Sequence, residues 1–256
     1  MMGSFAEFLE IPRADHNLCI IPNNISFVEA AALGCRFTTA YRAVVQQGGL
    51  GNNNESEVIT SVAIFGCGGL GLSCVMIAAA FCGKQKEIQI IAVDVSEEAL
   101  DKAREVGATH TINARKENVQ QRVMEITSSN NDSVVGADLA IDSAGFKATC
   151  ENAIHCTRRG GRMIQVGLPI GGQPPIIPMG MVAAKELEII GSHGCAAKDM
   201  PEILKLVSDK LLHPKKLIER EVTLEEGAKV LMDMDNQSPL GMVMITQFDD
   251  VPPSRY

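Results

Sequence analysis

The sequence has 256 residues, a formal net charge of -8, and 46% hydrophobic and 21% charged residues. A chain of this length buries a sizeable core and forms one large or two modest domains. Its negative charge, its lack of tryptophan and its two tyrosines argue against a nucleic-acid partner. We therefore expect its partners to be small molecules and further copies of the chain, which predicts a homo-oligomer.

No targeting or membrane segment is visible in the sequence. The first seven residues lack a basic segment and an apolar run. No uncharged apolar stretch is long enough to cross a bilayer, so we expect no membrane association. The eight cysteines form no C-x-x-C pair, which argues against a structural zinc knuckle. Thiols at apolar positions favour a reducing, cytoplasmic location.

The first fifty-odd residues predict two short helices and a loop. Residues 26–29, Ser-Phe-Val-Glu, have the spacing of a capping box, which opens a helix over 30–33. Gly34 and Cys35 are expected to break that helix, and a second helix is expected over about 38–46. Residues 48–56 are rich in glycine and asparagine, which is typical of a surface loop.

From residue 58 the chain alternates between short apolar strands and helices. Strands are expected near 62–65, 88–93, 109–112, 139–142, 162–166 and 187–191. Helices are expected near 70–82, 96–106, 118–127, 147–156 and 181–185. This alternation predicts an α/β protein with a doubly wound parallel sheet, whose ligand crevice lies at the carboxyl ends of the strands.

After Gly194 the alternation is expected to stop. Helices are predicted near 199–210 and 223–234, and a final strand near 241–245. Pro252 and Pro253 mark a tail.

Three glycines follow the first strand of the alternating region. Gly66, Gly68 and Gly71 have the G-x-G-x-x-G spacing of a dinucleotide-binding turn. Gly66 permits a tight turn, Gly68 lets a pyrophosphate touch the backbone, and Gly71 lets the next helix pack closely. The amino end of that helix offers free N–H groups and a positive dipole end to phosphates. The glycine spacing alone is common, so the surrounding strands and helix carry the prediction.

Asp94 ends the second predicted strand. A carboxylate at this place accepts both ribose hydroxyls of the adenosine half of NAD, and its charge repels the 2′-phosphate of NADP. The sequence therefore predicts an NAD site that lies between the glycine turn and Asp94.

The chain also resembles the zinc-dependent alcohol dehydrogenases of the medium-chain dehydrogenase/reductase family. The likeness runs from about residue 3 to residue 245. It is carried by five segments: 30–41 (Ala-Ala-Ala-Leu-Gly-Cys-Arg-Phe-Thr-Thr-Ala-Tyr), 62–71, 94–108, 137–145 and 160–167.

The resemblance implies a Rossmann sheet together with a partial GroES-like catalytic domain formed by the two chain ends. On this basis residues 1–36 are a remnant of the GroES-like domain, 37–193 bind NAD, and 194–256 return to the catalytic domain. In this family most of the catalytic domain precedes the equivalent of Gly3. That part carries a G-H-E motif and further zinc ligands, and no G-H-E triplet occurs in this sequence.

The resemblance also implies an activity, which is hydride transfer between an alcohol or carbonyl substrate and NAD(H), assisted by zinc in full-length relatives. It assigns Cys35 as the third zinc ligand and Thr39 as a contact of the nicotinamide. The implied cofactor-binding residues are Gly66, Gly68, Gly69, Leu70 and Gly71 at the pyrophosphate and nicotinamide, Asp94 at the ribose, Ser143 and Ala144 in the cleft, Gly167 beside it, and Val166, Ser192 and Gly194 at the carboxamide.

Two departures from the family pattern remove positive charge near the cofactor. Ala99 stands where many members have a basic residue near the ribose, and Met242 stands where many have Lys or Arg near the pyrophosphate. Both predict weaker cofactor binding.

Three functions remain open on the sequence. The chain is an NAD-dependent alcohol dehydrogenase, a non-catalytic NAD-binding protein with an incomplete zinc site, or a zinc-independent quinone or enoyl reductase. Cys35 in its present context argues against the third. If the other ligands are missing, Cys35 is expected to be a buried structural thiol.

Overall fold

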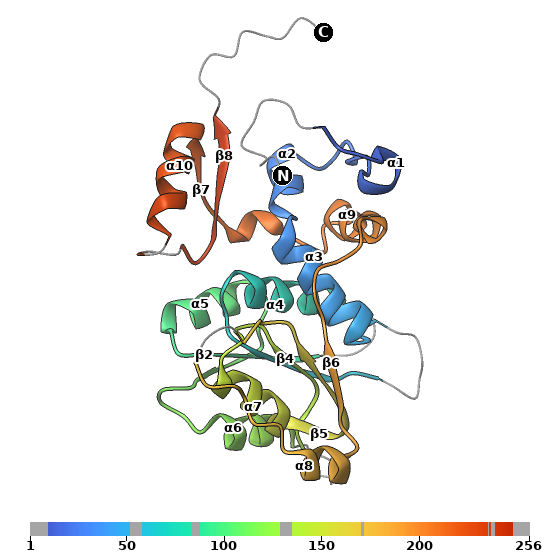
Figure 1. Cartoon of the computed structure of the whole chain (residues 1–256), viewed down its shortest axis with the longest axis vertical. Helices are drawn as coiled ribbons and strands as arrows, with labels where there is room; N and C mark the ends of the chain where they lie inside the picture. The colour runs from blue at the N-terminus through green and yellow to red at the C-terminus, as the bar shows by residue number, and fades with distance from the viewer. Residues whose placement is uncertain are drawn as a thin grey trace, which may run out of the picture.

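The computed structural model describes residues 10–51, 58–82, 88–128, 135–169, 172–234, 236 and 239–247. A layered domain of strands and helices forms the lower part of Figure 1. A smaller group, built from both ends of the chain, lies above it, and helix α3 runs between the two.

The central element is a six-stranded sheet in which every neighbouring pair is parallel. Its strands are β1 (Ser61–Phe65), β2 (Gln89–Asp94), β3 (His110–Asn113), β4 (Ala137–Asp142), β5 (Thr157–Gln165) and β6 (Glu188–Gly191). Their order is β3-β2-β1-β4-β5-β6. The order reverses beside β1, which creates the switch point where such sheets bind ligands. The predicted doubly wound sheet is confirmed.

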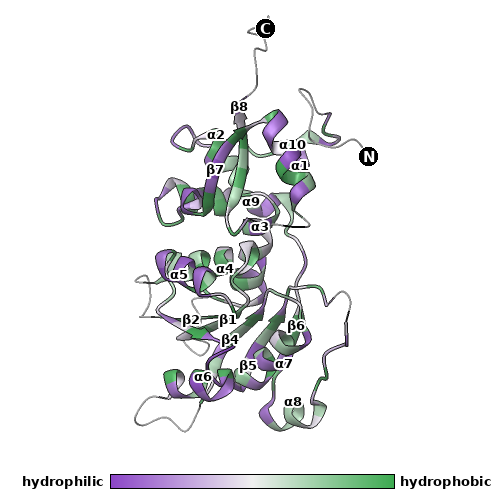
Figure 2. Cartoon of the chain, turned by 90° about the vertical axis from the view of Figure 1, so that its left-hand side faces the viewer, coloured by the Kyte–Doolittle hydropathy of each residue, from purple (hydrophilic) through white to green (hydrophobic). Residues whose placement is uncertain are grey.

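Helices cover both faces of the sheet. They are α4 (Gly69–Phe81), α5 (Glu97–Glu105), α6 (Val119–Thr127), α7 (Lys147–Cys156) and α8 (Met179–Lys185). Val62 and Ile64 of β1 join one apolar cluster with Leu72 of α4, whereas Phe65 joins a second cluster with Ile154 of α7. Because both faces are buried there, the central strands β1, β2 and β4 are largely apolar runs, and much of the central sheet is green in Figure 2.

The amino-terminal segment is more helical than predicted. It contains α1 (Ala14–Asn17), α2 (Phe27–Ala32), α3 (Cys35–Tyr41) and a π-helical turn, η1 (Arg42–Gln47). The capping box is confirmed, since the Glu29 N–H donates to the Ser26 hydroxyl and the Ser26 N–H donates to Glu29. The expected break at Gly34 and Cys35 is only partly right, because Gly34 is the N-cap and Cys35 begins α3. The domain boundary expected after residue 36 therefore falls inside a helix.

The carboxyl-terminal part contains a second parallel unit. Its elements are η3 (Ala197–Asp199), α9 (Met200–Ser208), η4 (Pro214–Leu217), β7 (Ile218–Thr223), α10 (Leu224–Asp233) and β8 (Met242–Gln247). Because β7 and β8 are parallel neighbours, α10 is a crossover helix, and the expectation that alternation stops after Gly194 is wrong. The sequence did not predict β7 because this strand has no apolar run. It is mostly exposed, and Val222 is its one buried residue.

The two chain ends lie together. Helix α2 contacts η4 and β8, and the Tyr41 hydroxyl of α3 donates to the Glu202 carboxylate of α9. Within the described ranges, no helix combines the length and the apolar character needed to cross a bilayer.

A cluster of hydrogen bonds around Asp138 links strands near their amino-terminal ends. Asp138 of β4 accepts hydrogen bonds from the backbone and hydroxyl groups of Thr60 and Ser61, and its other oxygen pairs with Arg158 of β5. Burial by itself raises the pKa of Asp138, but these donors hold the pKa below its ordinary value. The ionised carboxylate of Asp138 therefore joins three segments, which are residues 60–61, β4 and β5.

We expect the Asp138→Asn substitution to lower the free energy of unfolding by about 2 kcal/mol at pH 7, which is less than for a fully buried pair because Arg158 is partly exposed. The depressed pKa contributes stability above the unfolded-state pKa of about 3.9, and this contribution is lost as pH falls through the lower folded value. Urea unfolding at pH 7 and pH 3 measures both effects.

The matched control is Glu186→Gln, which breaks the exposed pair between Glu186 and Arg159 and is expected to change stability by less than about 0.5 kcal/mol. A difference between wild type and Asp138→Asn that does not shrink as pH falls contradicts the role given to the carboxylate.

Candidate nucleotide-binding site

The glycine turn after β1 is held by close backbone contacts. Gly66 has a φ of 94°, and its N–H donates to the Val93 carbonyl at 2.8 Å. A Cβ added to Gly66 would lie 2.6 Å from the Cβ of Ala144, and a Cβ added to Gly71 would overlap the Gly66 carbonyl oxygen. These contacts support the roles predicted for Gly66 in the turn and Gly71 in the close approach of the helix.

Gly68 lies on the open side of the turn. It is the N-cap of the 13-residue helix α4 and supplies no side-chain cap. A Cβ added to Gly68 would meet no atom within 4 Å. The first N–H groups of a helix have no partner within it and carry the positive end of its dipole. The turn therefore presents exposed backbone with a partial positive charge.

The Cys67 side chain points away from this open side. It is fully buried, its thiol lies 3.8 Å from the Val93 carbonyl oxygen, and burial raises the thiol pKa. Cys67 is thus a small apolar residue beneath the turn rather than a reactive group.

Asp94 lies against the turn from the end of β2. Its Oδ2 accepts the Cys67 N–H at 2.6 Å, and its Oδ1 accepts the N–H groups of Val95 and Ser96 at 2.7 and 2.9 Å. A carboxylate has about four acceptor positions. Three are used in this arrangement, and one position on Oδ2 remains.

Two residues at the end of β4 hold the glycine turn and the loop that follows β4. The Ser143 hydroxyl donates to the Gly66 carbonyl at 2.8 Å and lies 3.0 Å from the Phe65 carbonyl. Asp142 is fully buried, and its Oδ1 accepts the N–H groups of Ala144 and Gly145. The sequence reasoning did not assign Asp142 a role, although an acid that ends an apolar strand is a recognisable signal.

The ends of β5 and β6 carry polar atoms that lack partners. The N–H groups of Val166 and Gly167 both donate to the Asp142 carbonyl, and the Ser192 N–H donates to the Gln165 carbonyl. Among the described residues, the Gln165 Oε1 and the Ser192 Oγ are buried without any hydrogen-bond partner. Buried polar atoms are almost always paired, so these two are exceptions among the described residues.

Three other predicted residues have differing surroundings. Leu70 packs against the larger apolar cluster, and Gly194 has a φ of 63° with no atom within 4 Å of an added Cβ. Gly69 is covered: a Cβ added there would lie 2.5 Å from both Nε and Nη1 of Arg36. Arg36 was not predicted as a site residue, although it directly follows Cys35.

Cys35 and Thr39 lie one turn apart on α3. The Cys35 Sγ is 3.7 Å from the Thr39 Oγ1, and Thr39 is buried. Cys35 is exposed, so the expectation of a buried structural thiol is wrong. In the part of the chain that the structure describes, no three His, Cys, Asp or Glu side chains are grouped to hold a metal ion. These residues therefore do not fit a catalytic zinc, which needs three protein ligands.

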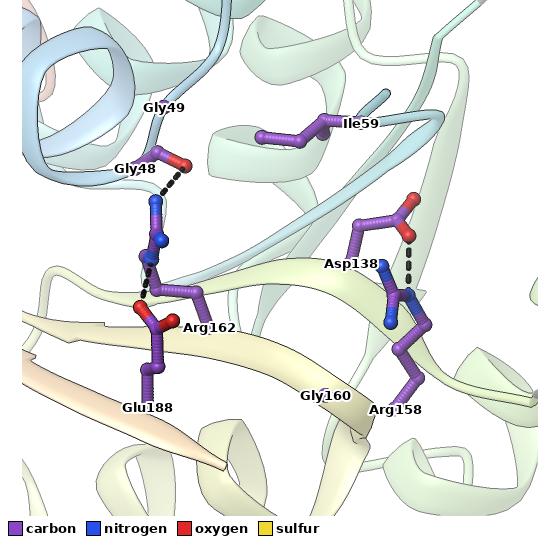
Figure 3. A pocket seen from close by; sticks show the side chains of 8 residues that line it. All are labelled: Gly48, Gly49, Ile59, Asp138, Arg158, Gly160, Arg162 and Glu188. Carbon is purple, nitrogen blue, oxygen red and sulfur yellow. Dashed lines mark hydrogen bonds and ion pairs between the residues drawn. The ribbon is translucent and has the colours of Figure 1, made fainter. Parts of the chain in front are cut away.

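A separate cavity of about 210 Å³ lies at the opposite, amino-terminal edge of the sheet (Figure 3). Its two arginines are paired, Arg158 with Asp138 and Arg162 with Glu188. Arg162 also donates to the Gly48 carbonyl at the end of η1. Because its charges are matched, this cavity has no excess charge to recognise a phosphate, and it is distinct from the glycine turn.

Comparison with known proteins identifies the family. The family described as zinc-binding dehydrogenase matches residues 69–209, which run from the start of α4 through strands β2 to β6 and on past α9. The chain belongs to the zinc-binding dehydrogenase family. The resemblance to zinc-type alcohol dehydrogenases found in the sequence is thereby confirmed.

Two curated relatives of this zinc-binding dehydrogenase chain are each 30% identical to it. An alcohol dehydrogenase of Geobacillus stearothermophilus aligns over 97% of this chain and 66% of its own length, and D-xylulose reductase A of Aspergillus niger over 91% and 60%. The structure of alcohol dehydrogenase TADH from Thermus sp. ATN1 superposes with a TM-score of 0.81 at 28% identity, covering 96% of this chain and 66% of that one. The chain thus spans less than two thirds of the length of these relatives.

The geometry of the glycine turn predicts different effects on stability for two alanine substitutions. Gly71→Ala is expected to lower the free energy of unfolding by about 2 kcal/mol or more, because the new methyl group overlaps the Gly66 carbonyl. Gly68→Ala is expected to leave it within about 0.5 kcal/mol, because the added methyl group meets open space. Chemical denaturation measures both, and equal losses contradict the geometry.

Proposed function

We propose that this chain is the nucleotide-binding part of an NAD-dependent alcohol dehydrogenase. The observation that supports the proposal most directly is the Asp94 carboxylate, 2.6 Å from the Cys67 N–H and next to the open backbone of Gly68. An acid at the second strand and a side-chain-free turn at the first are the two requirements of an NAD site. The structure of one similar protein, 27% identical with a TM-score of 0.77, is titled NAD-dependent alcohol dehydrogenase.

The adenosine end of the cofactor would lie over Asp94. The free acceptor position on Oδ2 takes one ribose hydroxyl without displacing the N–H donors already bound, whereas the sequence had suggested both hydroxyls. The negative charge disfavours a phosphate on the same ribose, which selects NAD over NADP.

The pyrophosphate would lie over Gly68 and the N–H groups that begin α4, flanked by Gly66, Gly69, Leu70 and Gly71. In this reading Ser143 and Ala144 shape the cleft by holding the turn, since the Ser143 hydroxyl is already bonded to it.

The nicotinamide end would lie toward the carboxyl ends of β5 and β6. The unpartnered Gln165 Oε1 and Ser192 Oγ would bond the amide there, beside Val166, Gly167 and Gly194. Thr39 would face the nicotinamide from α3. The cofactor, when bound, supplies the hydride acceptor, and the protein orients it and excludes water.

The substrate would be a small alcohol or its aldehyde or ketone. The names of the relatives, alcohol dehydrogenase and D-xylulose reductase, support this class and no single compound. Zinc assistance belongs to the longer relatives implied by the resemblance, with Cys35 as the one ligand that this chain supplies.

A second candidate function is a non-catalytic NAD-binding protein. The lack of a three-ligand group among the described side chains favours it.

Homo-oligomer formation, a cytoplasmic location and the division into segments 1–36, 37–193 and 194–256 remain part of the proposal. Oligomer formation is supported by edge strand β6 and the neighbouring α8, where Ile189 and Met179 are exposed.

We expect the chain to bind NADH more tightly than NADPH. The Asp94→Asn substitution should weaken NADH binding about tenfold, because a hydrogen bond to a charged group is lost, while NADPH binding stays equal or improves. Fluorescence titration measures both affinities. The control is Asp101→Asn, which removes the same charge from an exposed pair on α5. Equal affinities of the unsubstituted chain for NADH and NADPH contradict the role of Asp94.

We also expect the purified chain to hold well below one zinc ion per molecule, because a stable site needs three or four ligands. Elemental analysis by mass spectrometry after dialysis measures this. One tightly held zinc ion per chain that is lost on Cys35→Ser contradicts the prediction, and favours the complete dehydrogenase over the non-catalytic protein.

A further inference from the structure

The guanidinium of Arg36 lies where three distant parts of the chain meet. Arg36 is the second residue of α3, and its Nη1 donates to the Gly241 carbonyl before β8 at 3.2 Å. The same group packs on Gly69, the first residue of α4. The side chain is therefore fixed between a carbonyl and the amino end of a helix, next to the open backbone of Gly68.

The charge of Arg36 is uncompensated in the described part of the chain. None of the ion pairs found there includes it. Burial lowers its pKa, and Cys35 is the neighbour whose charge acts the other way. A cation beside the positive end of a helix dipole is unfavourable unless an anion lies against both. A negative group in the space beside Gly68 would therefore be attracted by both.

The donors of Arg36 are also only partly used. A guanidinium has five N–H donors, and the Gly241 carbonyl is the one hydrogen-bond partner found among the described residues. The carbonyl fixes the orientation of the fork and leaves other N–H groups free. A diphosphate matches a fixed arginine fork in both charge and geometry.

We infer that Arg36, which packs on Gly69 at the amino end of α4, binds the diphosphate of the nucleotide cofactor. This inference rests on the proposed function, because it takes the glycine turn as the cofactor site. Asp94 then recognises the sugar, and Arg36 with the α4 amino end recognises the diphosphate. The competing reading is a purely structural Arg36 that links α3 to the segment before β8.

The experiment compares the full chain with its Arg36→Met and Arg36→Lys variants. Calorimetry with NADH and ADP is expected to show about tenfold weaker binding of both ligands to Arg36→Met, and a shallower dependence on salt. Arg36→Lys should be intermediate, because it keeps the charge and loses the fork. Adenosine, followed by NMR titration, should bind all three proteins equally, because it has no phosphate.

The control is Arg159→Met, which removes the same charge from an exposed pair near the opposite edge of the sheet and should leave NADH binding unchanged. NADH affinity that is equal in wild type and Arg36→Met overturns the inference and leaves the NAD site intact. A loss of adenosine binding that parallels the loss of NADH binding also overturns the inference, since that indicates a structural role.

ADP binding that depends on Arg36 in a chain that does not bind NADH contradicts the proposed function but not the inference. Binding of neither ligand contradicts both.

Discussion

The contact between Gly71 and the Gly66 carbonyl is the constraint on which the nucleotide site depends. It brings helix α4 so close to the end of β1 that a methyl group at Gly71 would overlap the Gly66 carbonyl oxygen. The turn between them is then fixed by the Val93 carbonyl, the Ser143 hydroxyl and the Asp94 carboxylate. Each of these groups comes from the end of a neighbouring strand, so the parallel sheet itself assembles the site.

The candidate site contains both negative and positive charge. Asp94 places negative charge at the end of β2, whereas the α4 amino end and Arg36 place positive charge over the turn. The family pattern suggested that Ala99 and Met242 leave the cofactor with fewer cations than in relatives. Arg36 of α3 contacts the carbonyl of Gly241, the residue before Met242, so a cation lies next to the position of Met242.

The described residues form a candidate nucleotide site but no group of three metal-ligating side chains. More than a third of the length of each matched relative lies outside its alignment with this chain. Cys35 is exposed on α3, and the described residues offer it no second and third ligand. The two chain ends nevertheless pack together, α2 against β8 and α3 against α9.

The sequence by itself determined the six parallel strands, the glycine turn and Asp94, because apolar runs, glycine spacing and a carboxylate at a strand end are local signals. It did not reveal β7, whose polar sequence becomes a strand only by pairing with β8. Only the tertiary structure placed Arg36 against the glycine turn. The partners of Arg36, Gly69 and Gly241, lie 33 and 205 residues away along the chain, and a hydrogen bond or charge balance over such separations leaves no local pattern. It also decided that Cys35 is exposed, since burial depends on what packs above a helix.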